Sequence, residues 1–127
     1  MKRGVTSSMA PGAIGPYSHA VLCGEFLFVS GQIPVNAETG RMPDSIAEQA
    51  GVVLGNIEFI LNEAGFSRAD VVKTTIFLAD LADFEAVNAV YADFFAGCVF
   101  PARSTVQVTR LPRDARIEIE AVACKGS

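Results

Sequence analysis

Two segments with helical periodicity, separated by the most β-favouring stretch of the sequence, constrain the fold most strongly. Apolar residues recur at helical spacing over 46–64, behind a capping box formed by Ser45 and Glu48 and ahead of Gly65 as a C-cap. Residues 70–78 are dominated by β-branched and apolar side chains. The pattern predicts a helix of about five turns followed by a strand.

A second helix is predicted after this strand. Asp80 or Asp83 can cap it, and it should end near Gly97. Its apolar positions share one face: Phe84, Val87, Tyr91 and Phe94 or Phe95. In the first helix, Gly51 and Gly55 each cost about 1 kcal/mol relative to alanine, which favours an element packed closely against them.

The remaining segments predict strands. A hairpin is expected over residues 17–22 and 25–31, with Cys23 and Gly24 between its strands. The segment 101–108 is a proline followed by a short strand. After a turn at 111–114, the alternation over 116–123 predicts a last strand. The first few residues form an edge strand, and 34–43 is a loop. This order predicts an α+β fold, a mixed sheet with two helices on one face, in one domain spanning 1–127.

The composition excludes several classes of function. A net charge of −4 and a pI near 4.9 give no basic footprint for nucleic acid or an anionic membrane. Three cysteines and one histidine, with no metal-binding spacing, predict no metal site. No apolar run is long enough to span a bilayer and no signal peptide is recognised, so a cytoplasmic protein with reduced thiols is expected.

The strand over 101–108 carries the candidate chemistry. Arg103, Thr105 and Gln107 share one face, which is polar and basic, and the other face is expected to be buried. If this strand and the last one are neighbours, Arg103 and Glu118 can face one crevice on the side of the sheet away from the helices. Arg103 suits a carboxylate ligand, and the alternatives are a solvated arginine or a surface salt bridge with Glu118.

The other reactive side chains have simpler interpretations. His19 is expected to be a surface or hydrogen-bonded histidine, and Cys23 a small residue of a turn, since nothing near it in the sequence would activate a thiol. A sheet face left uncovered by helices would require a partner, which favours an oligomer.

Several short motifs, in order and in register from about residue 10 to residue 124, resemble the RidA family, also called YjgF. They are Gly15-Pro16-Tyr17-Ser18, Ser30-Gly31-Gln32-Ile33-Pro34, Val72-Lys73-Thr74-Thr75, Phe84 with Val87-Asn88, Phe100-Pro101-Ala102-Arg103-Ser104 and Ile117-Glu118-Ile119-Glu120. The resemblance implies a chorismate-mutase-like subunit and a homotrimer with a central barrel and ligand clefts between subunits. It also implies cofactor-free deamination of 2-imino and 2-enamino acids, such as 2-iminopropanoate and 2-iminobutanoate, to 2-oxo acids and ammonia.

The resemblance also assigns roles to individual residues. Arg103 would hold the substrate carboxylate with help from the backbone N–H at Thr105, Glu118 would position or deprotonate the attacking water, and Tyr17 would close the cleft. Ser30 and Gly31 would line the cleft, and Asn88 would be a hydrogen bonder near it. Relatives often have cysteine where this chain has Thr105, so a thiol-dependent role is not expected here.

Two other functions remain compatible with these residues. A non-catalytic trimer could use the same cleft to bind a small carboxylate or 2-oxo acid as a regulator. A holdase-like chaperone role would leave no sequence signature. RNA cleavage, attributed to some members of the family, is disfavoured by the acidic pI, the single histidine and the lack of interleaved basic and aromatic residues.

Overall fold

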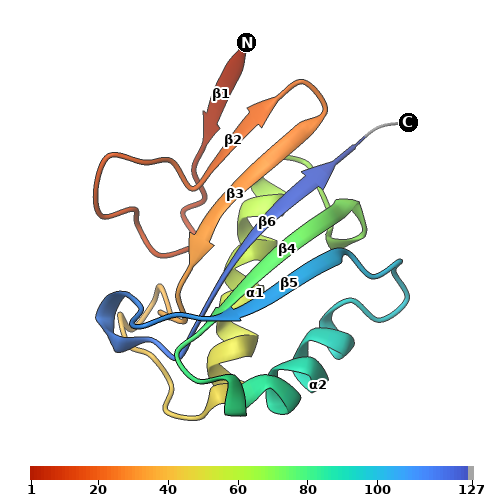
Figure 1. The fold of residues 1–127 in the computed structure, drawn as a ribbon. Coiled ribbons are helices and arrows are strands. Elements are labelled where there is room, and N and C mark those ends of the chain that lie inside the picture. Colours follow the sequence, from red (N-terminus) through yellow and green to blue (C-terminus); the bar gives the residue numbers. More distant parts are fainter. Residues whose placement is uncertain (126–127) are drawn as a thin grey trace.

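The computed structural model describes residues 1–125 and contains a six-stranded sheet with two helices on one side (Figure 1). The strand order is β1-β2-β3-β6-β4-β5, with β4 and β5 parallel and the other pairs antiparallel. The elements are β1 Lys2–Val5, β2 Ala20–Cys23, β3 Phe26–Gln32, α1 Ile46–Glu63, β4 Val71–Leu78, α2 Phe84–Phe94, β5 Ala102–Gln107 and β6 Ile117–Cys124. The predicted mixed sheet with helices on one face is confirmed.

The core lies between α1, α2 and the sheet. On β6, the alternate residues Ile117, Ile119, Ala121 and Ala123 are almost completely buried, as the period-2 pattern predicts. They meet the apolar face of α1, which begins after Ser45 as N-cap, with Glu48 completing the predicted capping box. Because these alternate residues are buried, their face of β6 is the one that lies against the helices.

The opposite face of the sheet is uncovered in the subunit and partly apolar. Phe26 and Phe28 of β3 are 45% and 49% exposed, and Val106 of β5 is 41% exposed. The sequence analysis expected a sheet face without helices to require a partner. Since no helix covers this side (Figure 1), the exposed rings supply an apolar surface suited to a second subunit.

Two predictions about β5 are wrong. β5 does not neighbour β6, because β4 lies between them and pairs with both. The polar face of β5 also faces the helices, since its residues lie opposite buried residues of β4: Arg103 opposite Thr74, Thr105 opposite Ile76 and Gln107 opposite Leu78. Ser104 and Val106, which were expected to be buried, are exposed.

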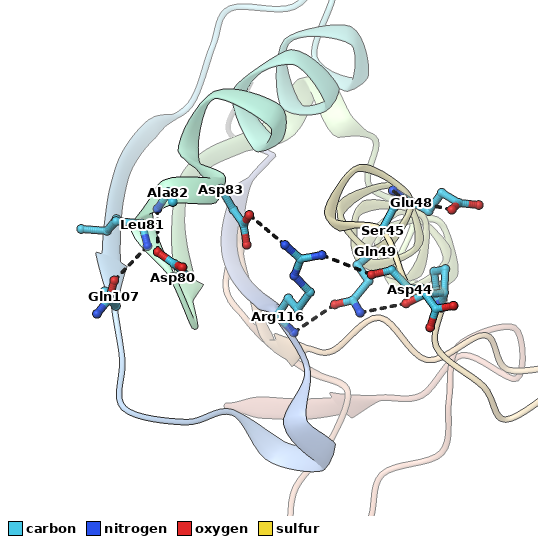
Figure 2. A network of polar contacts seen from close by, with 11 residues as sticks. Asp44, Ser45, Glu48, Gln49, Asp80, Leu81, Ala82, Asp83, Gln107 and Arg116 are labelled. Atoms are coloured by element: carbon cyan, nitrogen blue, oxygen red, sulfur yellow. Dashed lines mark hydrogen bonds and ion pairs between the residues drawn. The ribbon is translucent and has the colours of Figure 1, made fainter.

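A polar network joins the starts of α1, α2 and β6 (Figure 2). The Arg116 guanidinium pairs with Asp83 at 2.9 Å and donates to the carbonyl oxygen of Asp44. Gln49 accepts from the Arg116 backbone N–H and donates to the Pro43 carbonyl oxygen. The network fixes the beginning of β6, two residues before Glu118.

The segment leading into α2 departs from the predicted cap. Asp80 caps the short 3₁₀ helix Leu81–Asp83 by accepting from the Ala82 N–H, and Asp83 forms the ion pair with Arg116 (Figure 2). The side chain of Gln107 accepts from the Leu81 N–H at 2.9 Å, so β5 is tied directly to this turn. α2 then ends at Phe94, three residues before the predicted stop.

The expectation of close packing at Gly51 and Gly55 is wrong. A Cβ built at either position meets nothing within 4 Å, because both glycines lie on the side of α1 that faces away from the sheet. Their cost in helix propensity is therefore not compensated by packing within the subunit.

We expect Gly51→Ala to raise the free energy of unfolding by roughly 0.5–1 kcal/mol, since alanine restricts the unfolded chain and favours the helix. Urea denaturation of the purified protein measures the change. Gly65→Ala is the matched control and should destabilise, because Gly65 has φ +81°. A loss of stability in Gly51→Ala would mean that another subunit packs against this turn of α1.

Candidate functional site

A hollow of about 650 Å³ opens beside the end of β3. Its walls come from the loop over 11–17, the start of the loop after β3 and the 3₁₀ turn Pro112–Asp114. Tyr17, Gly31 and Glu118 line it, so three of the residues singled out from the sequence are brought together. Tyr17 is 51% exposed at the edge of the hollow.

Gly31 and Glu118 are in direct contact across β3 and β6. The pairing shifts between Val29 and Gln32, so a bulge places Ser30 and Gly31 beside β6. A Cβ at position 31 would lie 2.1 Å from Oε2 of Glu118 and 2.9 Å from its Cδ. Only glycine leaves room for the carboxylate here. Ser30 donates its hydroxyl to the Ser18 carbonyl oxygen at 2.7 Å.

The surroundings of Glu118 favour its protonated form. Partial burial raises the pKa of this carboxyl above its ordinary value of 4.5, and the negative charge of Glu120 on the same face of β6 raises it further. A glutamate with a raised pKa is a better proton acceptor near neutral pH than an ordinary one. Glu118 therefore has the properties of a general base facing a cavity.

Arg103 occupies a different environment, beneath α2. Its guanidinium carbon lies 4.9 Å from the centre of the Tyr91 ring and 5.4 Å from that of Phe84. Within residues 1–125 no carboxylate forms an ion pair with it. A half-buried cation held by aromatic rings, without an anionic partner, is suited to binding an anionic ligand.

Arg103 and Glu118 do not share a crevice within one subunit, which corrects the prediction from the sequence. Glu118 lies opposite Phe77 on the face away from the helices, whereas Arg103 lies opposite Thr74 on the helix side. Two strand spacings, roughly 10 Å, also separate β6 from β5. The candidate residues therefore form two half-sites on opposite faces of the sheet.

Two polar atoms beside Arg103 are buried without a hydrogen-bond partner among residues 1–125: Oδ1 of Asn88 and Oγ1 of Thr105. Asn88 lies on α2 between Phe84 and Tyr91, and Thr105 follows Arg103 on the same face of β5. Buried polar atoms are normally satisfied, so both are available to a ligand or water.

We expect Thr105→Val to raise the free energy of unfolding by about 1 kcal/mol, because it removes a buried hydroxyl that lacks a partner at nearly constant volume. Chemical denaturation measures the change. Thr109→Val, at an exposed position, is the matched control and should be neutral. Destabilisation by Thr105→Val would mean that the hydroxyl is hydrogen-bonded in the assembled protein.

His19 is hydrogen-bonded, which was one of the two interpretations offered from the sequence. It is 2% exposed, accepts from the Ser7 N–H through Nδ1 and faces the Pro11 carbonyl oxygen through Nε2 at 2.7 Å. Both ring nitrogens are thus engaged by the loop that carries Tyr17. This anchoring role could not be predicted from the sequence, because the two partners are backbone groups.

The aromatic surroundings of Arg103 were also not anticipated. Phe84 and Tyr91 were interpreted as part of an apolar stripe, and Tyr91 is indeed buried. The only sequence feature that could have indicated a shared role for the two rings is their spacing of seven residues, about two helical turns, which places them on one face of α2. Among residues 1–125, no group of three potential metal ligands occurs, and no helix is long and apolar enough to cross a membrane.

Comparison with known proteins identifies the family of the chain. The family model described as endoribonuclease L-PSP matches residues 7–125. The chain belongs to this family, the RidA family. It is 48% identical to the 2-iminobutanoate/2-iminopropanoate deaminase of Escherichia coli K12, over 98% of this chain and 99% of that protein. A relative named for a deaminase thus matches this chain over nearly its full length.

Solved structures of RidA relatives superpose closely on the fold. The YjgF gene product of E. coli matches with a TM-score of 0.96 at 48% identity, covering 98% of this chain and 99% of that one. E. coli TdcF, solved with bound serine, matches with a TM-score of 0.95 at 44% identity, with the same coverage of both chains.

Proposed function

We propose that this protein is a hydrolytic deaminase of reactive 2-imino and 2-enamino acids, releasing 2-oxo acids and ammonia. The observation that carries the proposal is the Arg103 guanidinium, which is held between aromatic rings with no anionic partner in residues 1–125. A 2-imino acid supplies the missing carboxylate. The E. coli relative at 48% identity carries the name of this activity.

The two half-sites are proposed to meet between subunits of a homotrimer. Arg103 and the backbone N–H of Thr105 from one subunit would face Tyr17, Ser30, Gly31 and Glu118 of the next. The uncovered apolar face around Phe28 and Val106 supports such an assembly. Sedimentation equilibrium tests it, and a stable monomer would contradict it.

The chemistry needs no cofactor. The protonated imine R–C(=NH₂⁺)–COO⁻ is already electrophilic, and Arg103 orients it through the carboxylate. Glu118 takes a proton as water adds to the imine carbon, and returns it to the nitrogen of the carbinolamine. The C–N bond then breaks as the carbinolamine hydroxyl forms the carbonyl and its proton passes to the departing ammonia, giving R–CO–COO⁻ and NH₄⁺. Tyr17, at the edge of the hollow, would close the cleft over the bound imine.

The direct test generates 2-aminoacrylate from serine with a serine dehydratase and follows the formation of pyruvate. Pyruvate should form faster than by spontaneous hydrolysis, in proportion to the amount of protein added. No acceleration, combined with tight binding of pyruvate by calorimetry, would favour the regulatory binder instead.

The function named in the description of the family, RNA cleavage, is not supported by His19. This histidine is not available as an acid–base group, because both of its ring nitrogens are occupied by backbone groups.

We assign the protein to the cytoplasm, where pyridoxal-phosphate enzymes release such imines. The cysteines Cys23, Cys98 and Cys124 are all free thiols.

A further inference from the structure

We propose that Tyr91, held in place by Thr74, is a positioning residue for Arg103, with Phe84 as a second wall. The inference rests on the proposed function in that Arg103 binds the substrate carboxylate. It concerns how this chain keeps an isolated guanidinium fixed before any ligand arrives.

Tyr91 is anchored at both ends of its side chain. It is 5% exposed, its ring packs on Phe95 with centroids 4.8 Å apart, and its hydroxyl is hydrogen-bonded to Oγ1 of Thr74 at 2.6 Å. Thr74 is itself 1% exposed and lies directly opposite Arg103 in the parallel pairing of β4 and β5. The hydrogen bond therefore ties α2 to the sheet at the level of Arg103.

The Tyr91 ring remains neutral in this environment. Burial raises the pKa of its phenol above the ordinary value of 10.0, and this outweighs the opposing effects of the Thr74 hydrogen bond and the Arg103 charge. The face of a neutral ring attracts a guanidinium through its quadrupole. Arg103 lies 4.9 Å from that ring, within the range of this attraction.

An aromatic support has an advantage over a carboxylate at this position. A carboxylate would fix the guanidinium but would also occupy its N–H groups and cancel its charge, so the ligand would have to displace it. Rings leave the planar N–H fork free for a bidentate carboxylate. They also restrict the rotamers of a long and flexible side chain, so less conformational entropy is lost when the ligand binds.

The first test needs no ligand. The side-chain Nε–H of Arg103 can be observed by ¹⁵N NMR and assigned by its disappearance in Arg103→Lys. We expect an order parameter of about 0.85 in the wild type and below about 0.6 in Tyr91→Leu. A mobile Arg103 in the wild type would overturn the proposal. This readout is independent of turnover, so a failure of the deaminase proposal remains distinguishable.

The second test separates positioning from packing by kinetics. Tyr91→Leu should raise KM roughly 10-fold with little change in kcat, since the carboxylate is bound equally in the ground and transition states. Tyr91→Phe keeps the ring and should recover most of this loss. Leu27→Ala, which removes a buried side chain of β3, a strand that does not neighbour β5, controls for a loss of packing and should leave KM close to the wild-type value.

A double-mutant cycle completes the design. If Tyr91 acts through the guanidinium, Tyr91→Leu should have no further effect on KM in an Arg103→Lys background. An equal rise of KM in both backgrounds, or a comparable rise in Leu27→Ala, would show that Tyr91 only stabilises the fold and would overturn the proposal.

Discussion

Replacing Arg103 by alanine is expected to lower kcat/KM for imine hydrolysis by roughly 10²–10⁴-fold. A hydrogen bond to a charged group contributes about 1.5–3 kcal/mol, and a bidentate carboxylate receives two of them. Each 1.4 kcal/mol corresponds to a factor of about ten. The measurement is pyruvate formation from 2-aminoacrylate, corrected for the spontaneous rate.

Two variants make this result specific. Arg103→Lys retains the charge but loses the planar fork, so its activity should fall between those of the wild type and the alanine variant. Arg110→Ala removes an exposed arginine that is ion-paired with Asp114, and its activity should match the wild type. Wild-type activity in Arg103→Ala would refute the assignment of the carboxylate site.

Local periodicity was sufficient to predict most of the secondary structure. The helix at 46–64 and the alternation of the last strand each depend on side chains a few residues apart, so the sequence alone reveals which positions are buried. The prediction failed for β5, where every second residue is polar. Its polar face turns toward the helices because it pairs with β4, and the identity of a pairing partner is a long-range property.

For the site, too, local features could be predicted from the sequence and long-range contacts could not. The motifs identified Arg103, Gly31 and Glu118 individually, but the contact between Gly31 and Glu118 depends on a bulge in β3. The hydrogen bond between Tyr91 and Thr74 joins α2 to β4. Periodicity could assign Tyr91 only to the core, because it carries no information about the partner of a buried hydroxyl.

Glu118→Gln is expected to lower kcat on the order of 10²-fold or more, since an amide cannot accept the proton of the attacking water. Gly31→Ala should cause a comparable loss without altering the carboxylate chemically, because the new Cβ would overlap Oε2 and displace the side chain. Gly51→Ala, on the outer face of α1, makes the same substitution away from the site and serves as the control. Activity near the wild-type level in both site variants would remove Glu118 from the mechanism.

The pH dependence of kcat tests whether Glu118 acts as the base. Its pKa is raised above 4.5 by burial and then by Glu120, and the base must be ionised, so kcat should fall as the pH drops through a value higher than that of an ordinary glutamate. Glu120→Gln removes the second cause and should move this limb to lower pH while leaving the plateau unchanged. A limb that stays in place in Glu120→Gln, and persists in Glu118→Gln, would belong to protonation of the substrate instead.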